Sequence, residues 1–308
     1  MDKAKRILVL GGNGFIGSNL CQELVKQGYI VTSFDRVLPQ KEIEGVKYIE
    51  GDFFDDDSLR ETVNGQDVVY HAISTVNPGN SNTEYMRGYR KDFIQSVKLC
   101  ELVRDNGIKL IFLSSGGTVY GVQEKQPISE DALPHPINHY GNIKLCIENT
   151  MLSFAYQNNM DIAIPRISNP YGPGQDSQKG VGFIDSVIRN ALSGNPVEVY
   201  GDGSVIRDYI YIDDVCKALA ALIDYKFSGS PVVNISTGIG TSNNEIIEIV
   251  KRIHGSLNVN YKESRSVDLK KVVLDNTKIE SVIGSSFMDL EEGIGLYYRY
   301  IKDERWVR

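Results

Sequence analysis

The 308-residue sequence lacks an apolar run that approaches the roughly 20 residues needed to span a bilayer. It also lacks a dense basic stretch, because its 33 Lys and Arg residues are scattered and are outnumbered by 40 Asp and Glu residues. The first residues, MDKAKRILVL, enter an apolar segment without the layout of a signal peptide. We therefore expect a cytoplasmic protein without a membrane span, and nucleic acid is not expected to be its main partner.

Cysteine and histidine are both scarce, with four residues of each. The cysteines form no CxxC pair and the histidines do not cluster at metal-ligand spacing, so the sequence indicates neither a metal site nor a redox pair. Buried structural thiols are the simplest interpretation of the four cysteines, which are Cys21, Cys100, Cys146 and Cys216.

The first half of the sequence contains short apolar segments that alternate with longer amphipathic ones. We expect strands at 6–10, 29–34, 46–50, 67–72, 109–114 and 161–167. We expect helices near 15–27, 57–63, 84–106 and 139–158. Such alternation, with strands rich in β-branched residues, is typical of an α/β fold in which helices cover both faces of a doubly wound parallel sheet.

The pattern changes after residue 168, where NPYGPG (169–174) and GDGS (201–204) are rich in turn residues. This change predicts two parts. Residues 1–168 form the doubly wound domain, and residues 169–308 form a smaller lobe over the C-terminal edge of the sheet. The strand-like segment DYIYI (208–212) is expected to return to the main sheet.

The segment GGNGFIG (11–17) follows the first expected strand and opens the first helix. The spacing of its glycines fits the fingerprint of a dinucleotide-binding turn in the required strand–turn–helix context. A pyrophosphate needs backbone N–H groups and a helix N-terminus close by, and Cβ atoms would block its approach. The residues expected to contact a dinucleotide here are Gly11, Gly14, Phe15, Ile16 and Gly17.

Asp35 follows the second expected strand, about 20 residues beyond the glycines. A carboxylate there accepts hydrogen bonds from the adenosine ribose and repels a 2′-phosphate, which favours NAD over NADP, although the neighbouring Arg36 weakens that preference. Asp52 follows another strand end and is expected to meet the adenine amino group. Phe53 and Ala72, which lie at or near strand ends, complete the expected cofactor site.

Tyr140 and Lys144 are four residues apart in an expected helix, so their side chains share one face. A free tyrosine has a pKa of about 10, and lowering it by about three units requires roughly 4 kcal/mol of extra phenolate stabilisation. One ammonium at about 5 Å supplies on the order of 3 kcal/mol at an effective dielectric constant near 20. The pair therefore makes a base at neutral pH only beside a second cation, and the nicotinamide ring of NAD⁺ is one.

The segments GGNGFIG, LSSGGTVYG (113–121), YGNIK (140–144), RISNPYGPG and GDGSVIRDYIYIDDV resemble the extended short-chain dehydrogenase/reductase family. In particular they resemble its sugar-nucleotide epimerases of the UDP-galactose 4-epimerase type. The resemblance spans nearly the whole chain. It implies a Rossmann domain that binds NAD, a C-terminal lobe that binds a nucleotide sugar, and a homodimer formed through the helices near 84–106 and 139–158.

The resemblance also implies roles for individual residues. Tyr140 is the catalytic base, and Lys144 orients the ribose and lowers the pKa of that base. The residues that match positions holding the nucleotide are Asn169, Arg207 and Arg265 at the diphosphate and Tyr200 against the uracil.

Two positions depart from the family pattern. The family places its catalytic Ser or Thr four residues before the tyrosine of the VYG run, and here that position is Gly116. Ser115 is the first candidate for the missing hydroxyl, because glycines let the chain bend. Thr118 is the second candidate, and the third possibility is that both serve only as turn hydroxyls. Asp92 takes the place of an asparagine that touches the cofactor in many relatives, so cofactor contacts are expected to be rearranged.

The expected reaction is inversion of carbon 4 of a nucleotide sugar, of the UDP-glucose/UDP-galactose type, through a transient 4-keto intermediate. The nearest alternatives are a 4,6-dehydratase and a decarboxylase of the same fold. Relatives with those activities carry acidic residues where this sequence has Gly117 and Thr118. An alternative of another class is a catalytically silent NAD-binding sensor, and Gly116 is the feature that favours it.

Overall fold

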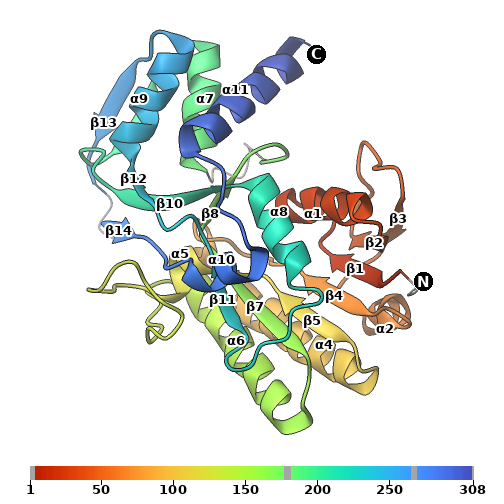
Figure 1. Ribbon diagram of the computed structural model, residues 1–308. Helices are drawn as coiled ribbons and strands as arrows, with labels where there is room; N and C mark the ends of the chain where they lie inside the picture. Colours follow the sequence, from red (N-terminus) through yellow and green to blue (C-terminus); the bar gives the residue numbers. More distant parts are fainter. Residues whose placement is uncertain (1–3, 177–181, 265–268, 307–308) are drawn as a thin grey trace.

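The computed structural model describes residues 4–176, 182–264 and 269–306, and its centre is an eight-stranded sheet (Figure 1). Every strand pairing in this sheet is parallel. A short strand, β6 (Ser114–Ser115), also pairs with β7. In order across the sheet, the other strands are β11 (Val232–Ile235), β7 (Ile162–Ile167), β5 (Lys109–Phe112), β4 (Val68–His71), β1 (Arg6–Leu10), β2 (Ile30–Asp35) and β3 (Val46–Glu50).

This strand order confirms the doubly wound α/β fold. The chain runs outward from β1 through β2 to β3 on one side, and from β4 through β5 to β7 on the other. The connections on either side of the β1–β4 pair therefore diverge. In such sheets a crevice opens at the carboxyl ends of the strands at this point, and ligands bind there.

Two layers of helices cover the sheet, as its apolar strands require (Figure 1). One core cluster lies between the sheet and α1 (Phe15–Lys26) together with α8 (Ile212–Ala221), which pack against each other. The other lies between the sheet and α2 (Asp56–Val63), α4 (Ile94–Asp105) and α6 (His139–Asn158). The central strands β4 and β5 are buried along their whole length because both of their faces are covered.

The helix expected at 84–106 is interrupted. It consists of α3 (Ser81–Arg87), a π-helical segment η1 (Gly88–Phe93) and α4. Gly88 explains the close approach of η1 to α6, because a Cβ there would lie 2.3 Å from Ile143 Cδ1. Short π-helical segments are frequent near functional sites, and this one places Asp92 in the protein interior.

The strand expected near 208–212 does not return to the main sheet. It is β10 (Ile206–Tyr211), and it pairs with β12 (Gly240–Ser242), β14 (Lys271–Val272) and β8 (Asn169–Tyr171) in a second sheet. The strand that does return is β11, which pairs with β7. Both β10 and β11 contain β-branched or aromatic residues and are largely buried, so composition alone did not show which one would join the main sheet.

A smaller group of elements lies above the second sheet in Figure 1. Their shared apolar cluster is formed by α7 (Phe183–Ser193), α9 (Asn243–His254) and α11 (Leu290–Trp306). Beside them β9 (Val197–Tyr200) pairs with β13 (Val259–Lys262). The division into 1–168 and 169–308 stays a prediction. Part of the chain after residue 168 belongs to the larger unit, because β11 joins the main sheet and α8 and α10 (Thr277–Ile283) pack beside it.

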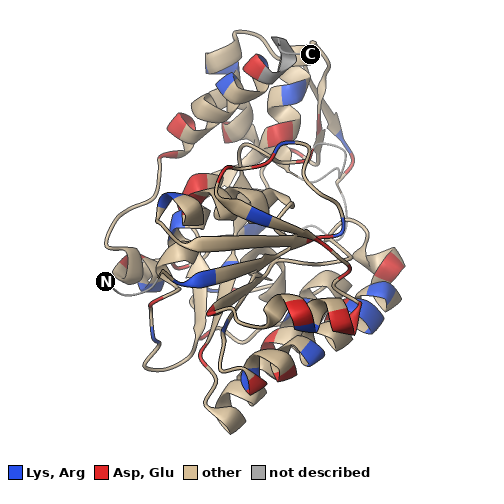
Figure 2. Ribbon diagram, turned by 90° about the vertical axis from the view of Figure 1, so that its right-hand side faces the viewer, with Lys and Arg blue, Asp and Glu red and all other residues tan. Residues whose placement is uncertain are grey.

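Basic and acidic residues are interspersed along the helices in the view of Figure 2. Within the described residues, no helix is both long enough and apolar enough to cross a membrane. The same part of the chain holds no cluster of three His, Cys, Asp or Glu side chains suited to a metal ion. The four cysteines are free thiols; Cys146 is half-buried and the other three are buried.

Candidate active site

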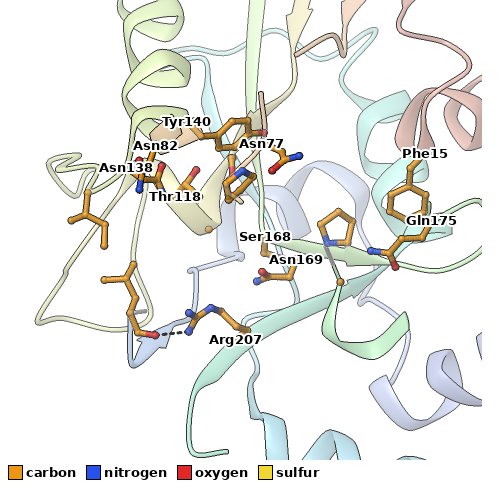
Figure 3. Close-up of a pocket in the computed structure, with 17 residues that line it drawn as sticks. Phe15, Asn77, Asn82, Thr118, Asn138, Tyr140, Ser168, Asn169, Gln175 and Arg207 are labelled. Atoms are coloured by element: carbon orange, nitrogen blue, oxygen red, sulfur yellow. Dashed lines mark hydrogen bonds between the residues drawn. The ribbon is translucent and has the colours of Figure 1, made fainter. Parts of the chain in front are cut away.

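A cavity of about 440 Å³ opens where several strands of the main sheet end. Its walls come from the segments that follow β1, β4, β6 and β7, and from β10 of the second sheet. Phe15, at the start of α1, and Arg207, on β10, both line this cavity together with Tyr140 (Figure 3). One cavity therefore connects the glycine-rich turn with the residues expected to act on a substrate.

The glycine-rich turn has the geometry that a pyrophosphate requires. Gly11 has φ +83°, and a Cβ on Gly17 would lie 2.1 Å from the Gly11 carbonyl oxygen. Gly14 is the N-cap of α1, and a Cβ on it would lie 3.2 Å from the Gly11 carbonyl oxygen. No side chain caps this helix, so the backbone N–H groups at Phe15 and Ile16 are available to an anion. The turn therefore fits a dinucleotide.

Asp35 lies at the end of β2 beside the glycine-rich turn. Its Oδ2 accepts a hydrogen bond from the Asn13 backbone N–H at 3.2 Å, and its Oδ1 accepts one from Arg36 N–H at 2.8 Å. The Asn13 side chain is held in turn by Ser33, whose hydroxyl donates to Asn13 Oδ1 at 2.8 Å. The carboxylate is therefore fixed next to the turn, where a ribose diol can reach its remaining lone pairs.

The other three expected cofactor residues differ in their surroundings. Ala72 contacts the glycine-rich turn, because a Cβ on Gly11 would lie 3.2 Å from the Ala72 carbonyl carbon. Asp52 is exposed, and its carboxylate accepts a hydrogen bond from Phe54 N–H at 3.0 Å. The Phe53 side chain is 2% exposed and its ring lies 5.0 Å from that of His71 in the core. Phe53 therefore faces the core with its side chain, which leaves only its backbone for a ligand.

Tyr140 and Lys144 lie on one face of α6, at its N-terminal end. Lys144 is 4% exposed, and its Nζ donates to the Leu113 carbonyl oxygen at 2.8 Å. The same Nζ lies 5.7 Å from the centre of the Tyr140 ring and 4.5 Å from that of Phe112. Tyr140 lines the cavity and Lys144 lies behind it, so the sequence-based pairing is present in space.

Burial works against a phenolate in the protein alone. Loss of hydration raises the pKa of Tyr140 to about 12, and the Asp92 carboxylate adds to the rise. Burial also lowers the pKa of Lys144 to about 8, against the opposing effect of Asp92 and Glu148. Lys144 alone therefore leaves Tyr140 protonated at neutral pH. A cationic ring beside the phenol supplies the missing stabilisation, which is what an oxidised nicotinamide offers.

Asp92 occupies a tightly enclosed position in η1. It is 2% exposed, and its Oδ2 accepts hydrogen bonds from Ser74 Oγ at 2.9 Å and from Thr75 N–H at 2.8 Å. Its Oδ1 is buried and has no hydrogen-bond partner among the described residues. An unpaired buried carboxylate oxygen is costly, and a donor from a ligand is one way to satisfy it.

The hydroxyls of LSSGGTVYG divide into two groups. Ser115 and Thr118 line the cavity, together with Gly117. Ser114 is buried, and its hydroxyl donates to Glu148 Oε1 on α6. The Thr118 hydroxyl is buried without a partner among the described residues.

Gly116 occupies the usual position of the catalytic hydroxyl, but a side chain there would not face the cavity. A Cβ on Gly116 would lie 2.3 Å from Leu274 Cδ1 and 3.1 Å from the Arg166 carbonyl oxygen. Leu274 is fully buried in a cluster with Val119 and Tyr120. A side chain at residue 116 would therefore enter packed protein, so Ser115 and Thr118, two residues that line the cavity, remain the candidates for contact with the sugar oxygen.

A buried ion pair that the sequence analysis did not predict supports this region. Arg166 on β7 is 4% exposed, and its Nη2 donates to Glu148 Oε2 at 2.6 Å while its Nε donates to both carboxylate oxygens at 3.2 Å. The guanidinium also lies 4.6 Å from the centre of the Tyr120 ring. Through Ser114 this pair ties β6 to α6. Glu148 lies one helical turn after Lys144, but that spacing predicts no contact with Arg166 on β7.

The nucleotide-binding residues expected from the resemblance lie at the other end of the cavity. Arg207 lines it and is oriented by hydrogen bonds from Nη1 to the carbonyl oxygens of Ile206 and Leu269, at 2.9 and 2.7 Å. Asn169 and Arg207 also line an adjoining cavity of about 260 Å³, whose wall includes Tyr200. Arg265 lies outside the described residues. The two cavities share Asn169 and Pro170 on β8 and Arg207 on β10 as lining residues.

Residues 7–236 match the family model described as the NAD dependent epimerase/dehydratase family. The chain belongs to this family. The resemblance found in the sequence is thereby confirmed, and the NAD-dependent chemistry of the family agrees with the glycine-rich turn of this epimerase/dehydratase.

Solved and curated relatives cover nearly the whole of this epimerase/dehydratase. The UDP-glucose 4-epimerase of Thermotoga maritima, solved with UDP-glucose, is 32% identical and has a TM-score of 0.90, over 97% of this chain and 99% of that one. The UDP-N-acetylglucosamine 4-epimerase of Methanobrevibacter ruminantium M1, solved with UDP-N-acetylmuramic acid, is 27% identical with a TM-score of 0.90, over 98% and 99%. The UDP-glucose 4-epimerase of Lactobacillus helveticus is 29% identical, over 91% of each chain.

Several cavity-lining residues of the epimerase/dehydratase carried no recognisable signal in the sequence. Asparagines in turns and helix caps are common, so spacing alone does not distinguish those that face a ligand. The polar ones are Asn77, Asn82, Asn138, Ser168 and Gln175.

Proposed function

We propose that this protein is an NAD-dependent 4-epimerase of UDP-sugars, of the UDP-glucose/UDP-galactose kind. The observation that carries the proposal is the placement of Tyr140, the glycine-rich turn and Arg207 on one cavity. The relatives named above act on sugars linked to UDP, and they align with nearly the whole chain.

The composition of the cavity favours epimerisation over dehydration. Dehydration between two sugar carbons needs an additional acid and base next to the sugar. None of the described residues that line the cavity is Asp or Glu. The positions where dehydratases carry acidic residues are Gly117 and Thr118, and both line the cavity without a titratable group. Inversion at carbon 4 needs, besides NAD, only the base that Tyr140 provides.

In the proposed reaction Tyr140, as phenolate, takes the proton of the sugar 4-hydroxyl. NAD, held by the turn at 11–17 and by Asp35, would supply the hydride acceptor and donor for carbon 4. Tyr140 gives the proton back to the new hydroxyl, while Lys144 keeps positive charge behind the phenol. Ser115 or Thr118 donates a hydrogen bond to the sugar oxygen, and Arg207 binds the diphosphate so that the sugar can turn over without leaving.

The test is Tyr140→Phe in the NAD-loaded protein, assayed with UDP-glucose and UDP-galactose. Loss of the phenol should reduce turnover about 10²–10⁴-fold, the usual contribution of a general base. UDP-sugar affinity should hardly change, because Arg207 remains. Full activity of the variant would refute the mechanism. An unmodified protein that binds NAD and UDP-sugar without converting it would instead support the silent sensor.

A further inference from the structure

Three asparagines surround the end of the cavity that holds Tyr140. Asn77 follows β4, Asn82 lies in α3, and Asn138 is the N-cap of α6. Figure 3 shows Asn82 and Asn138 beside Thr118, with Asn77 near Tyr140 and Arg207 at the opposite end. None of the three belongs to a motif that predicted the function.

The backbone fixes the orientation of each amide. Asn138 Oδ1 accepts the Gly141 N–H at 2.8 Å, and Asn82 Oδ1 accepts the His139 N–H at 3.3 Å. Asn77 Oδ1 accepts the N–H of Gly79 at 2.8 Å and that of Asn80 at 3.1 Å. A backbone N–H can only donate, so the oxygen of each amide must be the atom that faces it.

The NH₂ groups are consequently the polar atoms left for a ligand. Within residues 4–176, 182–264 and 269–306, no hydrogen bond joins these three Nδ2 atoms to the protein, and none of them is fully buried. Each NH₂ group carries two N–H donors and no acceptor. The three amides therefore present N–H donors to this end of the cavity.

We propose that the amides of Asn77, Asn82 and Asn138 form the sugar subsite and select uncharged sugars, whose hydroxyl or acetamido oxygens accept their hydrogen bonds. The inference rests on the proposed function, because it assumes that a nucleotide sugar enters this cavity. A uronic acid would bring a carboxylate, which needs a cation when it leaves water. Among the described lining residues the charged side chain is Arg207, at the far end of the cavity.

Asn82→Asp is the sharpest variant. It keeps the oxygen that accepts the His139 N–H, removes the NH₂ donor and adds negative charge, and Asn82 is exposed enough for the change to leave folding intact. Asn142→Asp is the matched control, because Asn142 lies in the first turns of α6, is exposed and does not line the cavity.

Calorimetry on the NAD-loaded proteins should compare UDP, UDP-glucose, UDP-N-acetylglucosamine and UDP-glucuronic acid. The unmodified protein should bind at least one of the two uncharged sugar nucleotides more tightly than UDP-glucuronic acid, by about 10-fold. Asn82→Asp should weaken binding of that nucleotide about 3- to 10-fold, the usual effect of a lost hydrogen bond, and leave UDP affinity unchanged. Asn142→Asp should change neither.

Two outcomes would overturn the subsite. One is binding of UDP-glucuronic acid by the unmodified protein as tightly as the uncharged sugars. The other is an Asn82→Asp variant whose affinities for UDP and for UDP-sugars are equally changed or unchanged. Because binding needs no turnover, failure of epimerisation with the predicted binding pattern would reject the proposed reaction while retaining the subsite. Epimerisation without that pattern would reject the subsite alone.

Discussion

Replacing Gly116 by serine tests whether a hydroxyl at the usual family position can serve this protein. The new Cβ would lie 2.3 Å from Leu274 Cδ1 and 3.1 Å from the Arg166 carbonyl oxygen. The distance to Leu274 Cδ1 is much shorter than a van der Waals contact. Leu274 is fully buried beside Tyr120 and Ile128, so its side chain has little room to move away. The backbone is not the obstacle, because Gly116 does not have a positive φ.

The cost follows from overpacking a closed core, which is typically about 1–3 kcal/mol. At about 2.1 cal/mol/K per residue for the entropy of unfolding, that loss lowers the melting temperature of a chain of this length by about 2–5 °C. The hydroxyl would also point into packed protein and away from the cavity. Gly116→Ser should therefore lose stability and should not restore activity to Ser115→Ala.

Thermal unfolding followed by circular dichroism measures the cost, and Gly117→Ser is the matched control. A Cβ on Gly117 meets only ordinary contacts, with Asn169 Oδ1 at 3.8 Å, so this variant should melt within about 1 °C of the unmodified protein. Combining Gly116→Ser with Leu274→Ala should cost less than the sum of the single changes, because the alanine frees the occupied space. A fully stable Gly116→Ser that rescues Ser115→Ala would show that residue 116 does face the sugar.

Three further changes test other parts of the site and the assembly. Asp92→Asn removes a carboxylate that raises the pKa of Tyr140, so the acid limb of the kcat/KM profile should move to lower pH; an unchanged profile would contradict the coupling. Asp35→Ala should weaken the preference for NAD over NADP in binding titrations, and equal binding of both by the unmodified protein would reject the role of Asp35. The expected homodimer would cover Ile94 on α4 and Tyr156 on α6, which are 48% and 93% exposed. Ile94→Glu should then sediment as a monomer at micromolar concentration, whereas a monomeric unmodified protein would refute the dimer.

Local features of the site could be predicted from the sequence because their geometry depends on neighbours in the chain. The turn at 11–17 needs glycine where a Cβ would meet the backbone of the same turn, as Gly17 does with the Gly11 carbonyl oxygen. The pairing of Tyr140 with Lys144 follows from the helical repeat. The strands of the first half were recognisable because strands buried on both faces are continuously apolar.

The support of the site depends on residues far apart in sequence, and here the sequence alone did not suffice. Glu148 and Arg166 meet because α6 packs against β7. Nothing in the sequence around either residue predicts a buried ion pair between them. The amides of Asn77, Asn82 and Asn138 lie around one end of the cavity because the loop after β4, α3 and the start of α6 meet there. The pairing of β10 with the second sheet also depends on distant segments, because its partners β8, β12 and β14 come from separate parts of the chain.

Residue 116 shows most clearly which features the sequence determined and which depended on the tertiary structure. The sequence by itself determined that the usual hydroxyl is missing, since Gly116 stands four residues before Tyr120. Only the tertiary structure decided why a side chain is not accommodated there, because the space is filled by Leu274, which is distant in the chain. Chain order sets which groups are available within a turn or a helix, whereas packing between distant segments sets where those groups point and what surrounds them.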